Sequence, residues 1–336
     1  MSPAGKRVTI REVADAAGVS TAAVSYALRG VQVSVETQER VRQVADELGY
    51  EANPIARALA SGRTGMVGIL GPSLQDLSQQ RFVAQAGREL LAHDHFALIL
   101  DAGGDAARQR MLAAQLRDQQ VDGLIVSPVD PADEFWSELA ESLAVVSIGD
   151  ALTGGGAAGE VLFDNRTGVR CALEHLHALG HARIAVLCPP GPPTTDRPAE
   201  VFVAAEADRL GLDVTVLSAL YELGEATDLA RSLLRADRPP TAAFCFSDSI
   251  AYGVYAACAE LGASIPDQLS VIGYDDHPVS ALLSPALTSF DWEYEQLAGT
   301  AVAMVLAAIH GRRSRRRVLI EPTLRVRGST ARPADG

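Results

Sequence analysis

The sequence predicts an all-α helix-turn-helix head followed by an α/β body that consists of two doubly wound parallel-sheet lobes. Residues 7–50 contain three short helical patterns separated by tight turns. From Met66 onward, apolar runs of strand length alternate with amphipathic helical stretches, which is typical of parallel sheets covered by helices on both faces. Because roughly 260 residues of this alternation are more than one ordinary sheet uses, we expect two similar lobes.

The charge is distributed unevenly along the 336 residues, whose formal net charge is −13. Residues 1–65 carry 8 basic and 7 acidic side chains, whereas the remainder carries 21 basic and 35 acidic ones. Only the near-neutral head could approach a phosphate backbone easily, and the acidic body favours solubility.

The cysteines and the apolar runs indicate a cytoplasmic protein without a membrane partner. No stretch reaches the roughly 18–20 apolar residues of a membrane span, and the N-terminus has no apolar signal region. The cysteines are widely spaced and form no CxxC or Cys/His pattern, so we expect buried thiols in a reducing compartment, at Cys171, Cys188, Cys245 and Cys258.

The first predicted helix begins with a capping box. Thr9 can accept a hydrogen bond from the amide of Glu12, whose side chain can reach back to the amide of Thr9. Gly18 ends the helix because it adopts a positive φ at little cost. The apolar face of this helix is formed by Ile10, Val13, Ala14 and Ala17.

Two further helices complete the predicted head. Ser20 can cap a helix over Thr21–Leu28 that Gly30 ends, and Ser34 can cap a third helix that ends before Gly49. The side chains expected inward are those of Val24, Leu28, Val41, Val44, Ala45 and Leu48. This order of helix, glycine turn, helix and supporting helix is the helix-turn-helix plan, although an ordinary three-helix bundle would show the same pattern.

A hinge is predicted between head and body, over residues 53–65. Asn53 as N-cap and Pro54 at the first helical position favour a helix over Ile55–Ser61, with Gly62 beyond its end. A helix this short is marginal in water, so it should form only when something holds it. The alternative is a plain linker with Leu59 packed on the body.

The body alternates strands and helices in order. The predicted strands are Met66–Leu70, Phe96–Leu100, Gly123–Val126, Ala144–Ile148, Arg183–Leu187, Val214–Leu217, Ala242–Phe246 and Leu269–Ile272. The predicted helices include Phe82–Ala92, Ala106–Gln119, Gly168–Leu179, Ala199–Leu210, Ala226–Leu234 and Ile250–Leu261. We expect the basic cluster Arg312–Arg317 to be a solvated loop.

The head closely resembles that of the lac-repressor (LacI/GalR) family of transcriptional regulators. The string that carries the resemblance runs from Val8 to Ser20, VTIREVADAAGVS, followed by Val24-Ser25. The resemblance implies that the second helix enters the major groove, where Thr21, Ala22 and Tyr26 read bases. Phosphate contacts are implied for Ser20, Ser25, Ser34 and Thr37, and Thr9 is counted with these DNA-binding residues.

The same resemblance continues into the hinge through Tyr50, Asn53, Ala56 and Leu59. It implies that two hinge helices, one from each subunit, pair in the minor groove of the DNA. Leu59 matches the residue that wedges into the central base step and kinks the duplex. Asn53, Ala56 and Leu59 are therefore expected DNA-binding residues.

The resemblance extends through the body almost to Ser329. Its marks include Val121-Asp122-Gly123-Leu124-Ile125, Asp164-Asn165, Leu179-Gly180-His181 and Gly273-Tyr274-Asp275-Asp276. It implies a body of the periplasmic-binding-protein type with a ligand between the lobes. We expect a head over residues 1–52, a hinge over 53–65 and a body over 66–331. The N-lobe is expected over about 66–163 and 294–321, and the C-lobe over about 164–290 and 322–331.

Several side chains are expected to point into the cleft between the lobes. Asp150, Ser247 and Asp275 each follow a predicted strand, and Arg197 matches a family arginine. Carboxylates and a guanidinium can bind vicinal hydroxyls, so a sugar or sugar derivative is the expected effector, with Phe82 or Trp292 stacked on its ring. A structural ion pair is the alternative for Arg197 and Asp275, and a core position is the alternative for Trp292.

Three departures from the family pattern lie near the expected pocket, so the identity of the effector cannot be transferred. Glu200 stands where a glycine is usual, and Gln80-Arg81-Phe82 replaces an aromatic pair. The third departure is the stiff loop Pro189–Pro193.

The expected function is that of a homodimeric, sequence-specific DNA-binding regulator, a repressor whose operator affinity responds to a bound small molecule. A secreted sugar-binding protein would share the body but would need a signal peptide and no DNA-binding head. A nucleotide-using enzyme is the other class, but neither a GxxxxGK[ST] loop nor GxGxxG spacing occurs, and no serine lies in a GxSxG context. We expect no catalytic residue, no metal and no cofactor.

Overall fold

The computed structural model describes residues 8–28, 30–50, 62–190, 199–312 and 316–334. The chain divides into two compact units, residues 1–64 and residues 65–336. The hinge residues Asn53, Ala56 and Leu59 lie outside the described residues, as does Arg197.

The first unit contains the three predicted helices, α1 (Ile10–Ala17), α2 (Thr21–Leu28) and α3 (Val35–Leu48). Gly18 and Gly49 end α1 and α3 in the left-handed conformation. Leu48 was predicted to point inward, and this is wrong, because 40% of it is exposed. Tyr50 packs on the core after the Gly49 turn instead, where its amide donates to Ala45. The core of this unit consists of Val13, Ala14, Ala17, Val24, Ala27, Val41 and Ala45.

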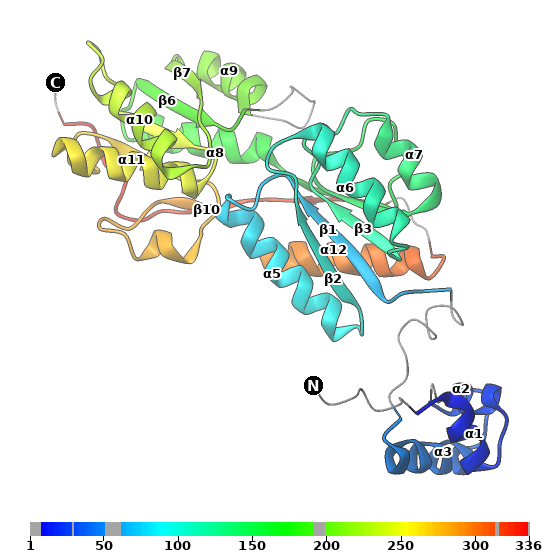
Figure 1. Cartoon of the computed structure of the whole chain (residues 1–336). Helices are drawn as coiled ribbons and strands as arrows, with labels where there is room; N and C mark the ends of the chain where they lie inside the picture. The colour runs from blue at the N-terminus through cyan, green and yellow to red at the C-terminus, as the bar shows by residue number, and fades with distance from the viewer. Residues whose placement is uncertain (1–7, 29, 51–61, 191–198, 313–315, 335–336) are drawn as a thin grey trace. The chain divides into compact units, whose positions relative to one another are not determined.

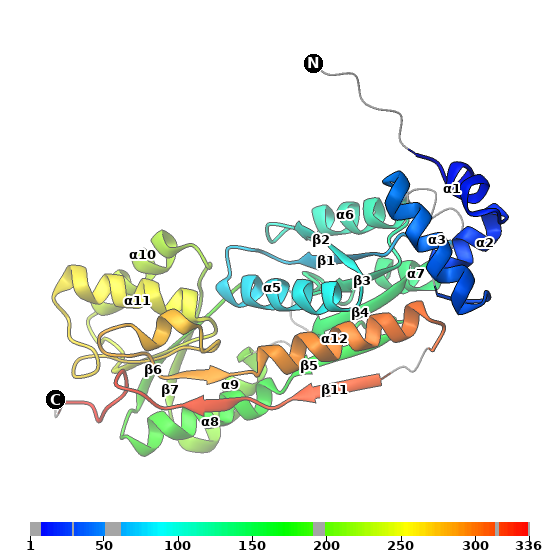
Figure 2. The ribbon, with the colours of Figure 1, turned by 90° about the horizontal axis from the view of Figure 1, so that it is seen from below.

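The N-lobe of the body is built on a six-stranded parallel sheet in the order β11-β5-β4-β3-β1-β2. Its strands β1, β2 and β3 are labelled in Figure 1. Its strands are β1 (Met66–Gly71), β2 (Phe96–Asp101), β3 (Gly123–Val126), β4 (Ala144–Gly149), β5 (Gly159–Phe163) and β11 (Arg316–Ile320). Helices α5 (Leu77–Ala92) and α12 (Tyr294–Ile309) lie side by side on one face of the sheet (Figure 2). The other face is covered by α6 (Ala106–Asp118) and α7 (Phe135–Ser142).

The C-lobe is built on a four-stranded parallel sheet in the order β7-β6-β8-β9. Its strands are β6 (Arg183–Cys188), β7 (Asp213–Ser218), β8 (Ala242–Cys245) and β9 (Ser270–Ile272). One face packs against α8 (Asn165–Ala178) and α9 (Ala199–Leu210), and the other against α10 (Leu223–Leu234) and α11 (Asp248–Leu261). The predicted fold class, a helix-turn-helix head and a body of two parallel-sheet lobes, is confirmed.

The chain passes between the lobes three times. It crosses after β5, after β10 (Ser289–Asp291) and after β11, and the short strand β12 (Thr323–Arg325) then pairs antiparallel with β10. A short 3-10 helix, Pro278–Ala281, precedes β10. These three connections join the lobes near one edge, and they leave the carboxyl ends of both sheets facing a common space.

The basic cluster at residues 312–317 was expected to be a solvated loop, but two of its arginines lie in a strand. Arg316 and Arg317 belong to the edge strand β11, which pairs with β5. Arg317 Nε donates to Glu160 Oε2 at 2.9 Å, so an ion pair across the two strands offsets the poor strand propensity of the basic run. Residues 313–315 lie outside the described residues.

The cysteines fit the prediction of thiols. Cys188, Cys245 and Cys258 are buried, Cys171 is half-buried, and all four are free of disulfide bonds. Within the described part of the chain, no helix combines the length and the apolar character needed to cross a bilayer.

Candidate functional site

The N-terminus of α1 is fixed by its own side chains. The amide of Thr9 donates to Glu12 Oε2 at 2.7 Å, and Thr9 Oγ1 accepts from the amide of Glu12 at 3.4 Å. This is the predicted capping box, and it occupies two amides that the helix leaves unpaired. These hydrogen bonds hold Thr9 at the start of α1, and its side chain is exposed at the surface.

The first turn of α2 presents small polar and apolar side chains to solvent. Ser20 Oγ accepts from the amide of Ala23 at 3.1 Å and so caps the helix. Thr21 and Ala22 are exposed, whereas Ser25 and Tyr26 are half-buried. The positive end of the helix dipole and the free amides of this turn favour an anionic partner such as phosphate.

A second capped turn lies at the start of α3. Ser34 Oγ accepts from the amide of Thr37 at 3.3 Å, and the two side-chain oxygens are 2.9 Å apart. The structure therefore places Ser20, Ser34 and Thr37 at helix N-termini, where hydroxyl and amide donors are concentrated.

A cavity of about 480 Å³ lies between the lobes of the body. Residues from both sheets line it at their carboxyl ends, such as Ser127 after β3 and Phe246 after β8. Four of the predicted effector residues line this cavity: Phe82, Asp150, Asp275 and Trp292. Ser247 does not line it, but lies directly behind the lining as the buried N-cap of α11.

Aromatic rings form one side of the cavity. Trp292 is only 2% exposed, and its Nε1 donates to the backbone oxygen of Tyr274 at 2.6 Å. Its ring meets those of Phe163 and Tyr274 edge to face, with centroids 4.8 and 5.1 Å apart. Trp292 is thus a core residue that also lines the cavity. The sequence left a core position and a cavity position open for it, and both describe it.

Asp76 is the most consequential residue that the sequence reasoning missed. It is the N-cap of α5, is 5% exposed, and lines the cavity from the N-lobe. The prediction began this helix at Phe82, a turn and a half too late, and so passed over its first turn. An aspartate followed by Leu77-Ser78 is a recognisable N-cap signal. Other lining residues that were not predicted are Phe163, Asn165, Tyr274 and Tyr294.

Asp76 and Asp275 each accept a hydrogen bond from a hydroxyl of the opposite lobe. Ser247 Oγ donates to Asp76 Oδ1 at 3.1 Å, and Tyr294 Oη donates to Asp275 Oδ1 at 3.4 Å. Burial raises the pKa of both carboxyl groups, most strongly that of Asp275, where the neighbouring charges of Asp76 and Asp248 add to the effect. Asp76 belongs to the N-lobe and Asp275 to the C-lobe, so these contacts join the two lobes.

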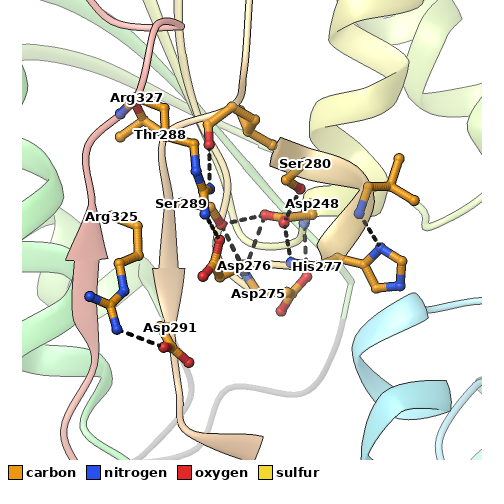
Figure 3. Close-up of polar contacts among 12 residues, drawn as sticks. Asp248, Asp275, Asp276, His277, Ser280, Thr288, Ser289, Asp291, Arg325 and Arg327 are labelled. Atoms are coloured by element: carbon orange, nitrogen blue, oxygen red, sulfur yellow. Dashed lines mark hydrogen bonds and ion pairs between the residues drawn. The ribbon is translucent and has the colours of Figure 1, made fainter. Parts of the chain in front are cut away.

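The loop that carries Asp275 is held by a buried carboxylate behind it (Figure 3). Asp248 Oδ1 accepts from the amides of Tyr274 and Asp275, at 2.9 and 3.2 Å, and from the hydroxyl of Ser289 at 2.5 Å. Its other oxygen accepts from the amide of His277 at 2.9 Å and from the hydroxyl of Ser280.

Only glycine fits at position 273, where this loop begins. A Cβ added to Gly273 would lie 2.0 Å from Asp248 Oδ1. The close approach lets one carboxylate reach two successive backbone amides, and this sets the direction in which Asp275 leaves β9.

The outer side of the same loop is tied to the C-terminal segment. Arg327 pairs with Asp276 at 2.5 Å and donates to the backbone oxygen of Leu287 at 2.7 Å. Arg325 pairs with Asp291 at 3.1 Å (Figure 3). Arg325 and Arg327 therefore fix the crossing segments beside the cavity.

The described residues contain no group of three or more His, Cys, Asp or Glu side chains that could hold a metal ion. The cavity side chains are those of a binding site, because carboxylates, amides and aromatic rings surround an open volume between two lobes.

Comparisons with known proteins agree with both parts of the chain. The profile described as "Bacterial regulatory proteins, lacI family" matches residues 9–53, and that of a "Periplasmic binding protein-like domain" matches residues 173–330. The HTH-type transcriptional regulator PtxS of Pseudomonas plecoglossicida is 32% identical over 338 residues, which cover 98% of each chain. The ribose operon repressor of Haemophilus influenzae is 29% identical, over 96% of this chain and 98% of the relative.

A solved structure shows the same fold across nearly the whole chain. The lac repressor dimer bound to operator and the anti-inducer ONPF has a TM-score of 0.82 at 24% identity, with 97% of this chain and 100% of that chain covered. At this identity the likeness supports the fold alone.

Proposed function

Because this chain belongs to the lacI family of bacterial regulatory proteins, we propose that its α2 helix reads operator DNA and that a small molecule in the interlobe cavity controls this binding. The family resemblance inferred from the sequence is confirmed, and the protein is a DNA-binding transcriptional regulator. The observation that carries the proposal is the joining, in one chain, of a capped helix-turn-helix to a two-lobed body with a cavity of about 480 Å³.

In the proposed complex, the exposed first turn of α2 lies in the major groove. The methyl groups of Thr21 and Ala22 suit the methyl group of thymine, and the hydroxyl of Tyr26 can donate or accept. Contacts to phosphates, which fix the register without reading sequence, are proposed for Thr9, Ser20, Ser25, Ser34 and Thr37. The capped helix starts at Ser20 and Ser34 support this assignment.

The hinge is proposed to pair with that of a second subunit in the minor groove, with contacts from Asn53, Ala56 and Leu59. Leu59 is the proposed wedge. We expect Leu59→Ala to weaken specific operator binding by roughly tenfold or more, because the wedge provides the contacts that offset DNA bending. Ligand affinity, measured by calorimetry, should not change. An operator affinity equal to that of the parent would contradict the wedge.

The ligand is proposed to be a sugar or a related polyol, bound by Asp150, Arg197, Ser247 and Asp275 between Phe82 and Trp292. The buried carboxylates can accept hydrogen bonds from hydroxyl groups, and the aromatic rings offer faces on which a sugar ring can stack. Ser247 acts from behind the lining in this proposal, by donating to the carboxylate of Asp76, which lines the cavity. The relatives are transcriptional regulators, and we propose that this chain likewise does not turn its ligand over.

A homodimer is proposed, with the edge strand β2 at its interface. β2 ends the sheet order, and its Phe96 and Ile99 are 65% and 45% exposed. Leu91, near the end of α5, is 60% exposed. The opposite edge strand β11 carries the charged residues Arg316 and Arg317, which discourage edge pairing. The more apolar of the two edges is the one that a second copy would cover.

Ligand binding is proposed to change the angle between the lobes and so to move the start of each hinge, near residues 63–65. This movement is proposed to release the operator. The protein is proposed to act as a repressor in the cytoplasm. The test is to select genomic fragments with the purified protein and to measure operator affinity while sugars, nucleosides and sugar phosphates are added. A fragment bound in preference to random DNA, with an affinity that one ligand class alters, supports the proposal. Equal binding to all DNA would contradict it.

A further inference from the structure

Gly65, the last residue of the predicted hinge, is held by the body from two sides. Its amide donates to Asp122 Oδ2 at 2.8 Å, and its carbonyl oxygen accepts from the amide of Phe96 at 2.8 Å. Its φ is +72°, a conformation that a residue with a Cβ adopts only under strain. These contacts therefore fix both the place and the direction in which the hinge joins β1.

The two contacts on Gly65 differ in kind. The one from Phe96 continues the parallel ladder of β1 and β2, in which Phe96 pairs with Met66, so it belongs to the sheet itself. The one from Asp122 comes from a half-buried side chain 57 residues further along the chain. A carboxylate that accepts from a backbone amide makes a charge-assisted hydrogen bond, which is stronger than the usual bond between amide and carbonyl. Asp122 is therefore the contact that one substitution can remove without loss of a sheet hydrogen bond.

Asp122 is itself held in place at the start of β3. Its amide donates to the backbone oxygen of Met66 at 2.8 Å, and Val121 before it is only 5% exposed. Gly123 after it packs so closely on α12 that an added Cβ would lie 2.6 Å from Val305 Cγ2. The sequence mark Val121-Asp122-Gly123 thus combines a buried side chain, an acceptor for the hinge and a close contact with α12.

Two elements of the N-lobe connect this position with the cavity. β3 begins at Gly123, directly after Asp122, and Ser127 directly after its other end lines the cavity. α12 begins with Tyr294, which lines the cavity and donates to Asp275 of the C-lobe at 3.4 Å. The far end of α12 packs on Gly123. A change at the cavity end of either element can therefore reach Asp122, which does not line the cavity itself.

We propose that Asp122 is a positioning residue, through which the N-lobe places the start of the hinge for operator binding. The inference rests on the proposed function and specifies which side chain couples the body to the hinge. A lobe movement that shifts β3 or α12 shifts this carboxylate, and Gly65 follows because the carboxylate holds its amide. When the bond is absent, operator binding must also order the backbone of Gly65, at a cost in conformational entropy.

The test compares Asp122→Ala with Asp122→Asn in the full-length protein without ligand. Fluorescence anisotropy gives the affinity of each for a genomic fragment that the parent selects, and for a random fragment of equal length. We expect Asp122→Ala to bind the selected fragment at least about fivefold more weakly, which is the cost of ordering one further residue. Asp122→Asn should bind like the parent, because its amide oxygen can accept the same hydrogen bond. Affinity for the random fragment should stay unchanged in both variants, since the head is intact.

Hydrogen exchange at the Gly65 amide reports the contact directly and needs no DNA. Mass spectrometry of peptides that cover residues 62–66 should show faster exchange in Asp122→Ala and parental exchange in Asp122→Asn, because hydrogen-bonded amides are protected. The matched control is Asp118→Ala, which removes a carboxylate that is 67% exposed and pairs with Arg117 at the end of α6. This control should alter neither the exchange at Gly65 nor the affinity for the selected fragment.

The proposal is overturned if Asp122→Ala binds the selected fragment as tightly as the parent, or if Asp122→Asn binds it as weakly as Asp122→Ala. It is also overturned if affinity for the random fragment falls by the same factor, or if exchange at Gly65 is unchanged. A parent that prefers no genomic fragment over random DNA contradicts the proposed function instead. Exchange at Gly65 then decides alone whether Asp122 holds the start of the hinge.

Discussion

At the scale of single residues, Asp248 holds the loop that carries Asp275, although Asp248 does not itself line the cavity. Its two oxygens accept from three backbone amides and two hydroxyls, and all of these donors belong to the segments that follow β9 or form β10. Asp248 itself is fully buried. Since Asp275 leaves the sheet from the loop held in this way, the orientation of a cavity-lining carboxylate depends on a neighbour that does not line the cavity.

The first prediction concerns Asp248 and its hydrogen bonds. Asp248→Ala should lower the free energy of unfolding by about 3 kcal/mol or more, because several buried donors would lose their only charged partner. Chemical denaturation of the full-length protein measures this. The matched control is Asp228→Ala, since Asp228 pairs with Arg231 at the surface and its side chain is 73% exposed. A loss no larger than that of the control would contradict the assigned role.

The second prediction concerns the raised pKa of Asp275. Burial and the charges of Asp76 and Asp248 raise this pKa above its ordinary value of 3.8, so the folded state holds the proton more tightly than the unfolded state. The stability that this provides is complete below pH 3.8 and is lost as the pH rises through the folded pKa. Asp275→Asn should therefore gain in Tm relative to the parent as the pH increases from 5 to 8.

Thermal unfolding of parent and variant at each pH measures this difference. Burial lowers the pKa of His175, His181 and His277, and these groups act in the opposite direction, but they are common to both proteins. A Tm difference that stays constant across this range would show that Asp275 does not carry the raised pKa.

Residue-level prediction from sequence succeeded where a polar side chain directly follows a recognisable strand. Asp150 and Asp275 could be placed at the carboxyl ends of β4 and β9 and both line the cavity. Asp76 could not be placed in the same way, because four residues of loop separate it from the end of β1 at Gly71. Its closeness to Ser247, 171 residues later, follows only from the packing of the two lobes.

At the scale of elements, the two edges of the N-lobe sheet differ in a way that bears on assembly. β2 exposes Phe96 and Ile99, whereas β11 combines Leu319 with Arg316 and Arg317. Charged side chains on an edge strand oppose pairing with another chain, and an uncharged apolar edge permits it.

The third prediction tests the β2 edge. Phe96→Asp should weaken dimerisation by roughly a hundredfold or more, since each of two symmetry-related copies loses the burial of a large side chain and gains a buried charge. Sedimentation equilibrium over a range of protein concentrations measures this. Leu319→Asp, on the opposite edge and 54% exposed, is the matched control. Equal effects of the two substitutions would remove β2 from the interface.

The strands that were not predicted from the sequence are β5, β10, β11 and β12, and the helices α7 and α12 were not named either. β10 and β12 have three residues each, and their pairing depends on the antiparallel ribbon that forms only when the chain crosses between lobes. β11 begins with two arginines, so its local sequence does not show the apolar pattern that predicts a strand. Most of the longer strands and helices with a buried apolar face were recognisable because their periodicity reflects the core directly, but α12, a helix of 16 residues, was not named.

At the scale of the whole molecule, three connections join the two lobes of the body. The chain crosses after β5, β10 and β11, and the cavity lies between the sheets that these crossings join. A ligand that contacts both lobes changes the equilibrium between their arrangements by its difference in affinity for them. The sequence predicts this architecture through its family resemblance, but the position of the ligand contacts depends on packing.

The measurement that tests this most directly is operator affinity as a function of cavity occupancy. Fluorescence anisotropy of a labelled operator, titrated with the full-length protein without ligand and at saturating ligand, gives both dissociation constants. We predict a change of about 5- to 150-fold, with the ligand affinity altered by the same factor when operator is present. Identical operator affinities at saturating ligand would contradict control of the head by the cavity.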